Sequence, residues 1–176
     1  MKIQAVDLFC GIGGLTYGLQ KAGIDVVAGI DNDQTCGYAY KKNNGSKFIN
    51  ADLTKYGGDK INKLFDKNSI RILVGCAPCQ PFSSHSFKNK NKVFDTRWSL
   101  IKYFGEIIEK THPEIVSMEN VRGIVKTNVF KIFLSVLVKN NYFIDYKVVY
   151  APNYGAPQNR SRLILLASRL GEIKIP

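Results

Sequence analysis

A cysteine flanked by prolines is the residue of this chain best suited to covalent chemistry. Cys79 lies in the run Gly75-Cys76-Ala77-Pro78-Cys79-Gln80-Pro81-Phe82-Ser83, directly after the apolar segment 70–74. Neither Pro78 nor Pro81 can donate a backbone hydrogen bond, so the predicted strand must end here. Pro78 also favours an extended conformation of the residue before it. The sequence therefore predicts a thiol on a stiff loop at the end of a strand, where it can reach a substrate.

Two ordinary roles compete with that interpretation of Cys79. Most free cysteines inside cells are buried packing residues, and this stretch alone does not decide against such a role. Cys76 and Cys79 also form a C-x-x-C pair, which is typical of redox sites and of half a zinc site. The chain has only four cysteines, with no second pair and no histidine cluster, so we expect neither a metal site nor redox chemistry.

Length, composition and charge limit the class of protein. The chain has 176 residues, of which 45% are hydrophobic, enough for one globular domain with a sizeable core. No stretch reaches the roughly 18 apolar residues of a membrane span, and the N-terminal residues lack the apolar core of a signal peptide. We therefore expect an intracellular, cytoplasmic protein with reduced cysteines. The net charge of +11 indicates a polyanionic partner, although a basic protein without one remains an alternative.

Strand-like and helix-like segments alternate along the chain. Apolar runs predict strands at 3–9, 25–30, 48–50, 70–74, 114–118, 142–150 and 162–167. Helical spacing of apolar residues predicts helices at 15–22, 34–42, 59–66, 97–110 and 127–139. The polar, basic segment 83–92 interrupts the pattern and is predicted to be a mobile loop. This order predicts an α/β domain with a mostly parallel sheet covered on both faces, and no linker divides it.

Polar residues follow several of the predicted strands at the points where the strands end. The run 7–14, Asp31, Asp52, Cys79 and Glu119 each lie at or just after such an end. Ligands of open α/β sheets bind beyond the carboxyl ends of the strands. We therefore expect these residues to converge on one edge of the sheet.

The glycine-rich segment after the first strand is typical of a nucleotide-type cofactor pocket. Gly11, Gly13 and Gly14 let a ligand approach the backbone, and the next helix offers unpaired N–H groups to a negative group. Asp31, twenty residues after Gly11, is placed to accept hydrogen bonds from ribose hydroxyls. Thr16 stands where the dinucleotide fingerprint has its third glycine, which disfavours a dinucleotide oxidoreductase without excluding it.

The second half of the chain adds an acid and two cations. Glu119, next to Asn120, can hold or deliver a proton if burial raises its pKa. Arg160 and Arg162 alternate along the start of a predicted strand, so they share a face and one of them can hold a substrate oxygen. A surface ion pair for Glu119 and phosphate binding by the arginines are the alternative roles.

Taken together, these motifs resemble one family, the cytosine-C5 DNA methyltransferases. Five segments match in family order over nearly the whole chain: 7–14 is similar to the S-adenosylmethionine loop, 78–83 to the nucleophile loop, Asp95-Thr96-Arg97 to a further family element, Glu119-Asn120-Val121 to the glutamate motif and Gln158-Asn159-Arg160-Ser161-Arg162 to the arginine motif. The resemblance implies one catalytic domain over residues 1–176. Its expected fold is a three-layer, Rossmann-like sheet of the S-adenosylmethionine-dependent methyltransferase type.

The resemblance also implies a mechanism for methylation of a cytosine flipped out of duplex DNA. Cys79 is expected to attack carbon 6 and Glu119 to interact with N3. Arg162, with Arg160 beside it, is expected to hold the carbonyl oxygen. Carbon 5 then takes the methyl group, and loss of its proton with release of Cys79 restores the ring. The basic loop 84–92 is expected to close over the DNA and contact phosphates.

For the cofactor, the resemblance implies contacts from several loops of the same edge. Phe9 is expected to contact the adenine, Asp31 the ribose and Asp52 the adenine amino group. Gly11, Gly13 and the start of the helix are expected to face the methionine end. The other residues that the resemblance assigns to the pocket are Asp7, Gly14, Asn32, Leu53 and Pro78. Asn32 departs from relatives in which an aromatic residue at this place stacks on the adenine.

Family members continue past the arginine motif with a target-recognition domain and a closing segment, and neither is recognisable here. We expect a second polypeptide or a further C-terminal segment to supply them, so the chain is either a subunit of a split enzyme or a fragment. A silent DNA-binding remnant and a tRNA cytosine methyltransferase are the alternatives. The chain by itself is expected to bind S-adenosylmethionine weakly, to bind DNA with little sequence preference and to methylate poorly.

Overall fold

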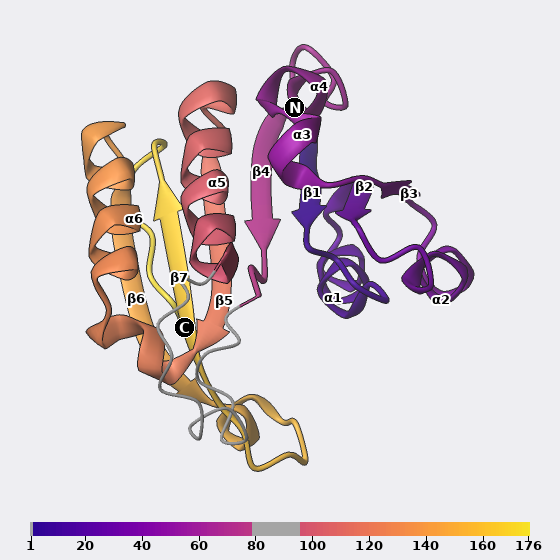
Figure 1. Ribbon diagram of the computed structural model, residues 1–176. Helices are drawn as coiled ribbons and strands as arrows, with labels where there is room; N and C mark the ends of the chain where they lie inside the picture. The colour runs from indigo at the N-terminus through magenta and orange to yellow at the C-terminus, as the bar shows by residue number, and fades with distance from the viewer. Residues whose placement is uncertain (1, 79–95) are drawn as a thin grey trace.

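The computed structural model describes residues 2–78 and 96–176, with residues 96–99 as backbone only (Figure 1). Cys79, the predicted loop 83–92 and Asp95 lie outside the described residues. The strands are β1 (Ile3–Leu8), β2 (Asp25–Asp31), β3 (Lys47–Asn50), β4 (Ile70–Gly75), β5 (Ile115–Val121), β6 (Phe143–Tyr150) and β7 (Ser161–Ser168). The helices are α1 (Gly14–Lys21), α2 (Cys36–Asn43), α3 (Leu53–Tyr56), α4 (Gly58–Asn62), α5 (Thr96–Thr111) and α6 (Asn128–Lys139), with 3-10 helices η1 (Arg122–Lys126) and η2 (Ala151–Tyr154).

All seven strands form one sheet in the order β3-β2-β1-β4-β5-β7-β6. The neighbouring strands β3, β2, β1, β4 and β5 all run parallel to one another, whereas β7 runs antiparallel to both β5 and β6. Parallel neighbours need crossover connections, and the helices between them provide these. The prediction of a mostly parallel α/β sheet is therefore confirmed.

Helices cover both faces of this sheet. On one face, α5 and α6 lie side by side over a large core that includes Leu73, Phe104 and Phe133 (Figure 1). On the other face, α1 packs Leu15 and Leu19 on a smaller cluster formed by Ala5, Val26, Ile72 and Val74. Neighbouring residues of β4 thus enter different cores, as the alternation of side chains along a strand requires. The three layers predicted from the sequence are present.

The helix predicted at 59–66 is shorter than expected, because α4 ends at Asn62, and a separate short helix, α3, precedes it. Gly57 has a φ of +79°, which residues with a Cβ rarely adopt, and it separates α3 from α4. Asp52 caps α3 by accepting a hydrogen bond from the backbone N–H of Thr54. Beyond α4, Phe65 is buried in a turn, so its spacing imitates a helical pattern without forming one.

Strand β5 also extends beyond its predicted end at residue 118. Its residues Glu119, Asn120 and Val121 pair with Ile164, Leu163 and Arg162 of β7. An antiparallel partner far along the chain provides these hydrogen bonds, and a local sequence pattern does not contain that information. Glu119 consequently projects from within a strand and not from the loop after it.

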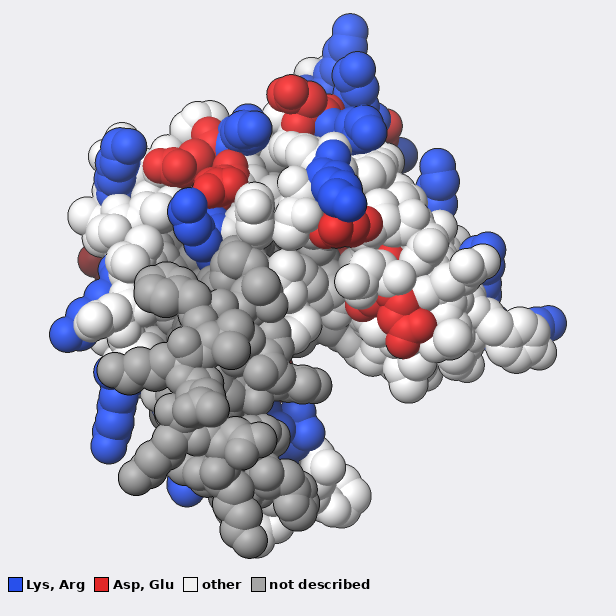
Figure 2. All heavy atoms as spheres, viewed as in Figure 1, with Lys and Arg blue, Asp and Glu red and all other residues white. Residues whose placement is uncertain are grey.

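Charge is unevenly distributed over the surface. Figure 2 shows lysine and arginine side chains around the periphery of one face, with acidic side chains in small groups between them. No helix of the described residues is long and apolar enough to cross a membrane. Within the same residues, no group of three or more histidine, cysteine, aspartate or glutamate side chains is arranged to hold a metal ion.

A clamp of three charged residues joins the strands at the edge opposite their carboxyl ends. Arg71 of β4 donates from Nε to Oε2 of Glu114 at 3.1 Å and from Nη2 to Oε1 at 3.0 Å. Arg169, which follows β7, approaches the same carboxylate at 3.3 Å. Paired guanidinium and carboxylate groups fix geometry as well as charge. The clamp therefore ties β4, β5 and β7 together at this edge of the sheet.

Tyr40 of α2 fills the space between the first two strand-helix units. Its side chain is fully buried and lies against Gly29 of β2 and Gly13 before α1. A Cβ at Gly13 would lie 2.7 Å from a ring carbon of Tyr40 and would also overlap the Asn44 side chain. Gly13 has a φ of +88°, so a side chain there is excluded both by packing and by backbone conformation. Tyr40 thus sets the position of the loop before α1.

We expect Glu114→Gln to remove the acid-sensitive part of the clamp. Burial alone would raise the pKa of Glu114, but the hydrogen bonds and charge of Arg71 outweigh it and hold the pKa below its usual value. A lowered folded-state pKa gives stability above the unfolded-state pKa, and this stability is lost as the pH falls through the folded-state value. Glu114→Gln should lower the free energy of unfolding by about 2 kcal/mol at pH 7 and by less as the pH falls from 5 to 3.

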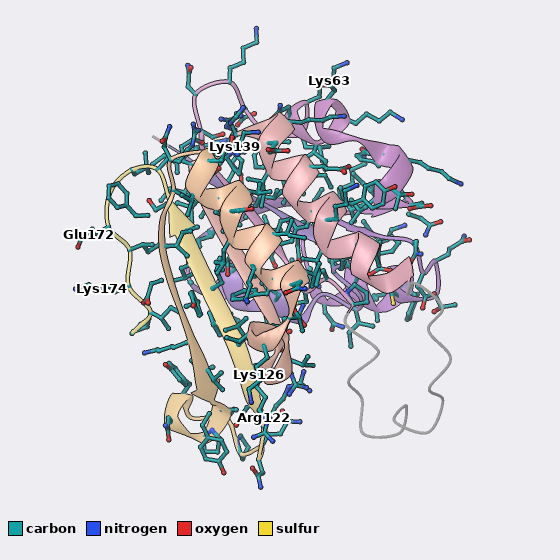
Figure 3. The ribbon with its side chains drawn as sticks, turned by 60° about the vertical axis from the view of Figure 1, so that its left-hand side comes forward. Lys63, Arg122, Lys126, Lys139, Glu172 and Lys174 are labelled. Atoms are coloured by element: carbon teal, nitrogen blue, oxygen red, sulfur yellow. The ribbon has the colours of Figure 1, made fainter. Side chains whose placement is uncertain are left out.

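Urea unfolding at several pH values measures this effect. Glu172→Gln is the matched control, because Glu172 is exposed and points away from the fold (Figure 3). An equal loss of stability at pH 7 and pH 3 in Glu114→Gln would contradict the prediction.

A second prediction concerns Gly13. Gly13→Ala should destabilise the fold by about 2–4 kcal/mol, because it adds backbone strain to a collision with Tyr40. Gly18→Ala is the control, since Gly18 lies inside α1 with open space around its Cβ position, and it should stabilise by about 0.5–1 kcal/mol. Denaturant unfolding with unchanged m values tests both variants, and comparable stabilities for the two would rule out the packing role of Tyr40.

Candidate active site

The carboxyl ends of β1, β2, β4 and β5 meet at one edge of the sheet. Leu8 at the end of β1 pairs with Ile30 of β2 and Gly75 of β4, and Gly75 pairs with Met118 of β5. The described residues that the sequence assigns to the site lie at this edge in two groups, one near β1 to β3 and one near β4 to β7. They are called the cofactor half and the base half after the roles that the sequence predicts for them. The predicted convergence of the two halves is therefore observed for the residues that the structure describes.

The loop after β1 turns sharply under the control of three left-handed residues. Phe9, Gly11 and Gly13 have φ values of 58°, 52° and 88°. The turn is held by hydrogen bonds from Cys10 N to Ile30 O at 3.2 Å and from Gly13 N to Cys10 O at 2.9 Å. Phe9 is not a glycine, so its positive φ stores strain of the kind found at functional sites. These dihedral angles and hydrogen bonds together fix the backbone of the loop between β1 and α1.

The outer side of this loop is free to receive a ligand. A Cβ built on Gly11 or Gly14 meets no atom within 4 Å, in contrast to the filled space behind Gly13. Gly14 begins α1, whose first backbone N–H groups have no partner within the helix. The open surface and the helix start together fit a ligand with a negative group, such as the carboxylate of S-adenosylmethionine.

Asp31 has a structural task that the sequence did not indicate. Its Oδ2 accepts a hydrogen bond from Gly11 N at 2.8 Å, and its Oδ1 accepts one from Asp33 N at 2.9 Å. The carboxylate therefore ties the end of β2 to the glycine loop. Each oxygen retains a second lone pair for a ribose hydroxyl. Asn32 beside it is exposed.

Asp52 and Leu53 occupy the end of the cofactor half next to β3. Oδ1 of Asp52 accepts from Thr54 N at 2.9 Å and from Thr54 Oγ1 at 2.8 Å, and these hydrogen bonds lower the pKa of Asp52. The hydrogen bond from Ala51 N to Asp31 O holds this segment beside β2. The Leu53 side chain is buried in the main core, so it anchors this segment to the rest of the domain.

Asp7 lies behind the glycine loop and not on its open surface. Its side chain is 1% exposed, and Oδ2 accepts a hydrogen bond from Thr16 Oγ1 at 2.7 Å. Burial raises the pKa of Asp7 to about 7. The sequence placed Asp7 in the cofactor pocket by its position in a motif, whereas the structure places its carboxylate under α1.

The base half is organised around Glu119. Arg162 Nε lies 3.0 Å from Glu119 Oε1, and Arg160 Nη2 lies 3.7 Å from the same oxygen. Arg160 directly precedes β7 and Arg162 lies in it, and their side chains lie on the same side, as predicted from their spacing. Both guanidinium groups approach the same oxygen, Oε1, of the Glu119 carboxylate. Arg162 is anchored further by donating from Nη1 to Ser161 O at 2.8 Å.

Asn120 connects Glu119 to the segment that leads to Cys79. Its Nδ2 donates to Ala77 O at 3.0 Å, and its Oδ1 accepts from Val121 N at 2.8 Å. The side chain is 3% exposed, so these bonds are shielded from water. The sequence analysis noted Asn120 only as a neighbour of Glu119, and nothing local in the sequence indicates its bond to Ala77.

Two further residues of this segment are described. Pro78 is exposed and directly precedes the undescribed residues 79–95. Cys76 is a free thiol, and burial, followed by the charge of Glu119, raises its pKa well above the ordinary value. A thiol in that state is a packing residue and a poor nucleophile, as expected from the sequence.

Comparison with known proteins agrees with the family resemblance found in the sequence. Residues 3–175 match the family described as C-5 cytosine-specific DNA methylase. The type II methylase M.HgiDII of Herpetosiphon aurantiacus is 44% identical over 97% of this chain and 48% of its own length. The type II methyltransferase M.XorII of Xanthomonas oryzae is 32% identical over 94% of this chain and 40% of its own length.

A solved structure agrees with these relatives. A putative DNA modification methyltransferase encoded within a prophage of E. coli superimposes with a TM-score of 0.79 and 26% identity, covering 95% of this chain and 47% of that one. The chain spans about half the length of the curated relatives it matches. The family match over nearly the whole chain, together with the glycine loop and the Glu119–Arg162 pair, shows that this chain belongs to the C-5 cytosine-specific DNA methylase family.

Proposed function

We propose that this chain is the catalytic domain of a DNA (cytosine-5) methyltransferase, which transfers a methyl group from S-adenosylmethionine to carbon 5 of cytosine. The observation that carries this proposal is the cluster of Glu119, Arg162 and Arg160 on β5 and β7, linked through Asn120 to the segment before Cys79. A carboxylate and a guanidinium held side by side can contact two atoms of a pyrimidine ring, and we assign the bond to a third atom to Cys79.

In this mechanism Cys79, Glu119 and Arg162 act on different atoms of one cytosine base. The Cys79 thiolate forms a bond to carbon 6, and the electron pair displaced from the ring double bond makes carbon 5 nucleophilic. The Glu119 carboxyl group faces N3 and interacts with it as that nitrogen gains electron density, while Arg162 holds the carbonyl oxygen. S-adenosylmethionine supplies the methyl group. Loss of the carbon 5 proton then expels Cys79 and restores the ring.

The cofactor assignment rests on the shape and chemistry of the first half of the site. Gly11, Gly13 and Gly14 present an open backbone surface beside the start of α1. Asp31 and Asp52 come from neighbouring strand ends, where they can accept hydrogen bonds from ribose and adenine. We assign Phe9 to the adenine and Asn32 to the rim of the same pocket, with Asp7 and Leu53 supporting it from within and Pro78 at its border with the nucleophile segment.

Duplex DNA is the proposed substrate, and target recognition is assigned to a part of the enzyme outside these 176 residues. The net charge of +11 favours contact with phosphates. A second polypeptide or a further C-terminal segment is the source that we propose for the recognition domain, in a cytoplasmic enzyme of the restriction-modification type.

Covalent trapping tests this proposal. With its recognition partner present, the protein should form a denaturant-resistant adduct with duplex DNA that contains 5-fluorocytosine, because fluorine at carbon 5 blocks release of Cys79. Cys79→Ala should form no adduct, whereas Cys36→Ala, which changes a cysteine at the start of α2, should react as the wild type does. An adduct that persists in Cys79→Ala, or no adduct from wild type that binds both DNA and S-adenosylmethionine, would overturn the assignment.

Asn120→Ala tests how the nucleophile segment is positioned. Loss of the bond to Ala77 should destabilise the fold by about 1–3 kcal/mol and slow adduct formation by more than about tenfold, while the affinity for S-adenosylmethionine stays unchanged. Asn140→Ala is the control, because it removes a similar side-chain bond, Nδ2 to Val136 O, at the end of α6. The positioning role is excluded if both variants lose stability and neither slows the adduct rate.

A further inference from the structure

The 3-10 helix η1, which directly follows β5, carries two cationic side chains that have no part in the mechanism described above. Arg122 and Lys126 are exposed at its two ends. Ile124 between them is fully buried in the main core. The short helix thus turns one apolar side chain inward and leaves its two charged side chains at the surface.

The backbone of η1 is held from both sides. Val121, the last residue of β5, pairs with Arg162 of β7. At the other end, Thr127 N donates to Ile124 O at 2.9 Å, and Thr127 Oγ1 accepts from Phe130 N at 3.3 Å at the start of α6. A paired strand before η1, a capped helix after it and a buried side chain within it therefore fix its position relative to the base half.

Both cations lie at the edge of the sheet that carries the base half. Arg122 follows Glu119 by three residues, so along an extended strand it lies about 10 Å further on. Figure 3 shows Arg122 and Lys126 at one end of the sheet, and Lys63 and Lys139 at the opposite end. The two cations of η1 are therefore near neighbours of the residues proposed to hold the base.

A base that leaves the DNA stack brings part of the backbone with it. It stays bonded to its sugar, and that sugar stays bonded to the phosphates on either side. A cytosine held by Glu119 and Arg162 therefore places phosphate groups around the base half. Guanidinium and ammonium groups bind phosphate by charge-assisted hydrogen bonds. Such contacts offset part of the free energy that unstacking a base costs.

We propose that Arg122 and Lys126 form a phosphate-binding ledge on η1, which holds the DNA backbone beside the flipped cytosine. This inference rests on the proposed function of the same site. The two side chains are positioning residues, because they contact the backbone and not the base, and their contribution is the same for every DNA sequence. Since η1 is fixed relative to β5 and β7, the ledge sets the position of the strand relative to Glu119 and Arg162.

The salt dependence of DNA binding tests this inference. The dissociation constant of the chain with two duplexes of unrelated sequence is measured between about 50 and 200 mM salt. Arg122→Gln and Lys126→Gln should each weaken binding of both duplexes by about five- to tenfold at about 0.1 M salt and reduce the slope of log K against log salt by about 0.9. Lys63→Gln makes the same change of charge at the opposite end of the sheet and should leave the slope as in the wild type.

Variants that keep the charge separate phosphate binding from a structural role. Arg122→Lys and Lys126→Arg should retain the wild-type slope, and all five variants should bind S-adenosylmethionine as the wild type does. The inference is wrong if the two glutamine variants of η1 change the slope no more than Lys63→Gln, or if Arg122→Lys loses as much of it as Arg122→Gln. Covalent trapping through Cys79 still decides the proposed function in either case. If the wild-type chain binds neither duplex at about 50 mM salt, the assignment of DNA as substrate and this inference fall together.

Discussion

The close approach of β4 to β1 is the constraint on which the arrangement of this site depends. Gly75 ends β4 with Leu8 O and a ring carbon of Phe104 each 3.2 Å from the position of its missing Cβ, so the two strands meet without a side chain between them. The glycine loop leaves from β1 and the nucleophile segment leaves from β4. Because β5 pairs with the other side of β4, Glu119 is fixed relative to both. A shift of β4 would separate the cofactor half of the site from the base half.

The two halves carry opposite charge. Asp7, Asp31 and Asp52 make the cofactor half acidic, and Arg160 and Arg162 outnumber Glu119 in the base half. An acidic pocket suits a cationic methyl donor, and a basic one suits a polyanionic substrate. Among the described residues, Figure 2 shows lysine and arginine side chains both at the rim and within the face that it presents.

Much of the fold could be read from local patterns. The alternation of strands and helices, the sheet type and the edge at which polar residues collect all follow from periodicity and from glycine and proline positions. Two local predictions were wrong. The helix expected at 59–66 ends at Asn62, where the chain turns, and β5 continues past residue 118 because β7 pairs with Glu119, Asn120 and Val121. Both errors concern interactions or conformations that a short window of sequence does not contain.

Residue type and local spacing fix which chemical groups this protein has and the order of the elements that carry them. Which of these groups meet depends on how the elements pack in three dimensions. The pair of Glu119 with Arg162 and the bond from Asn120 to Ala77 each join residues about 43 positions apart in the chain. The burial of Asp7 under Thr16 likewise depends on how α1 packs on the sheet. Such contacts arise from the packing of whole elements, so residue identity alone does not specify them.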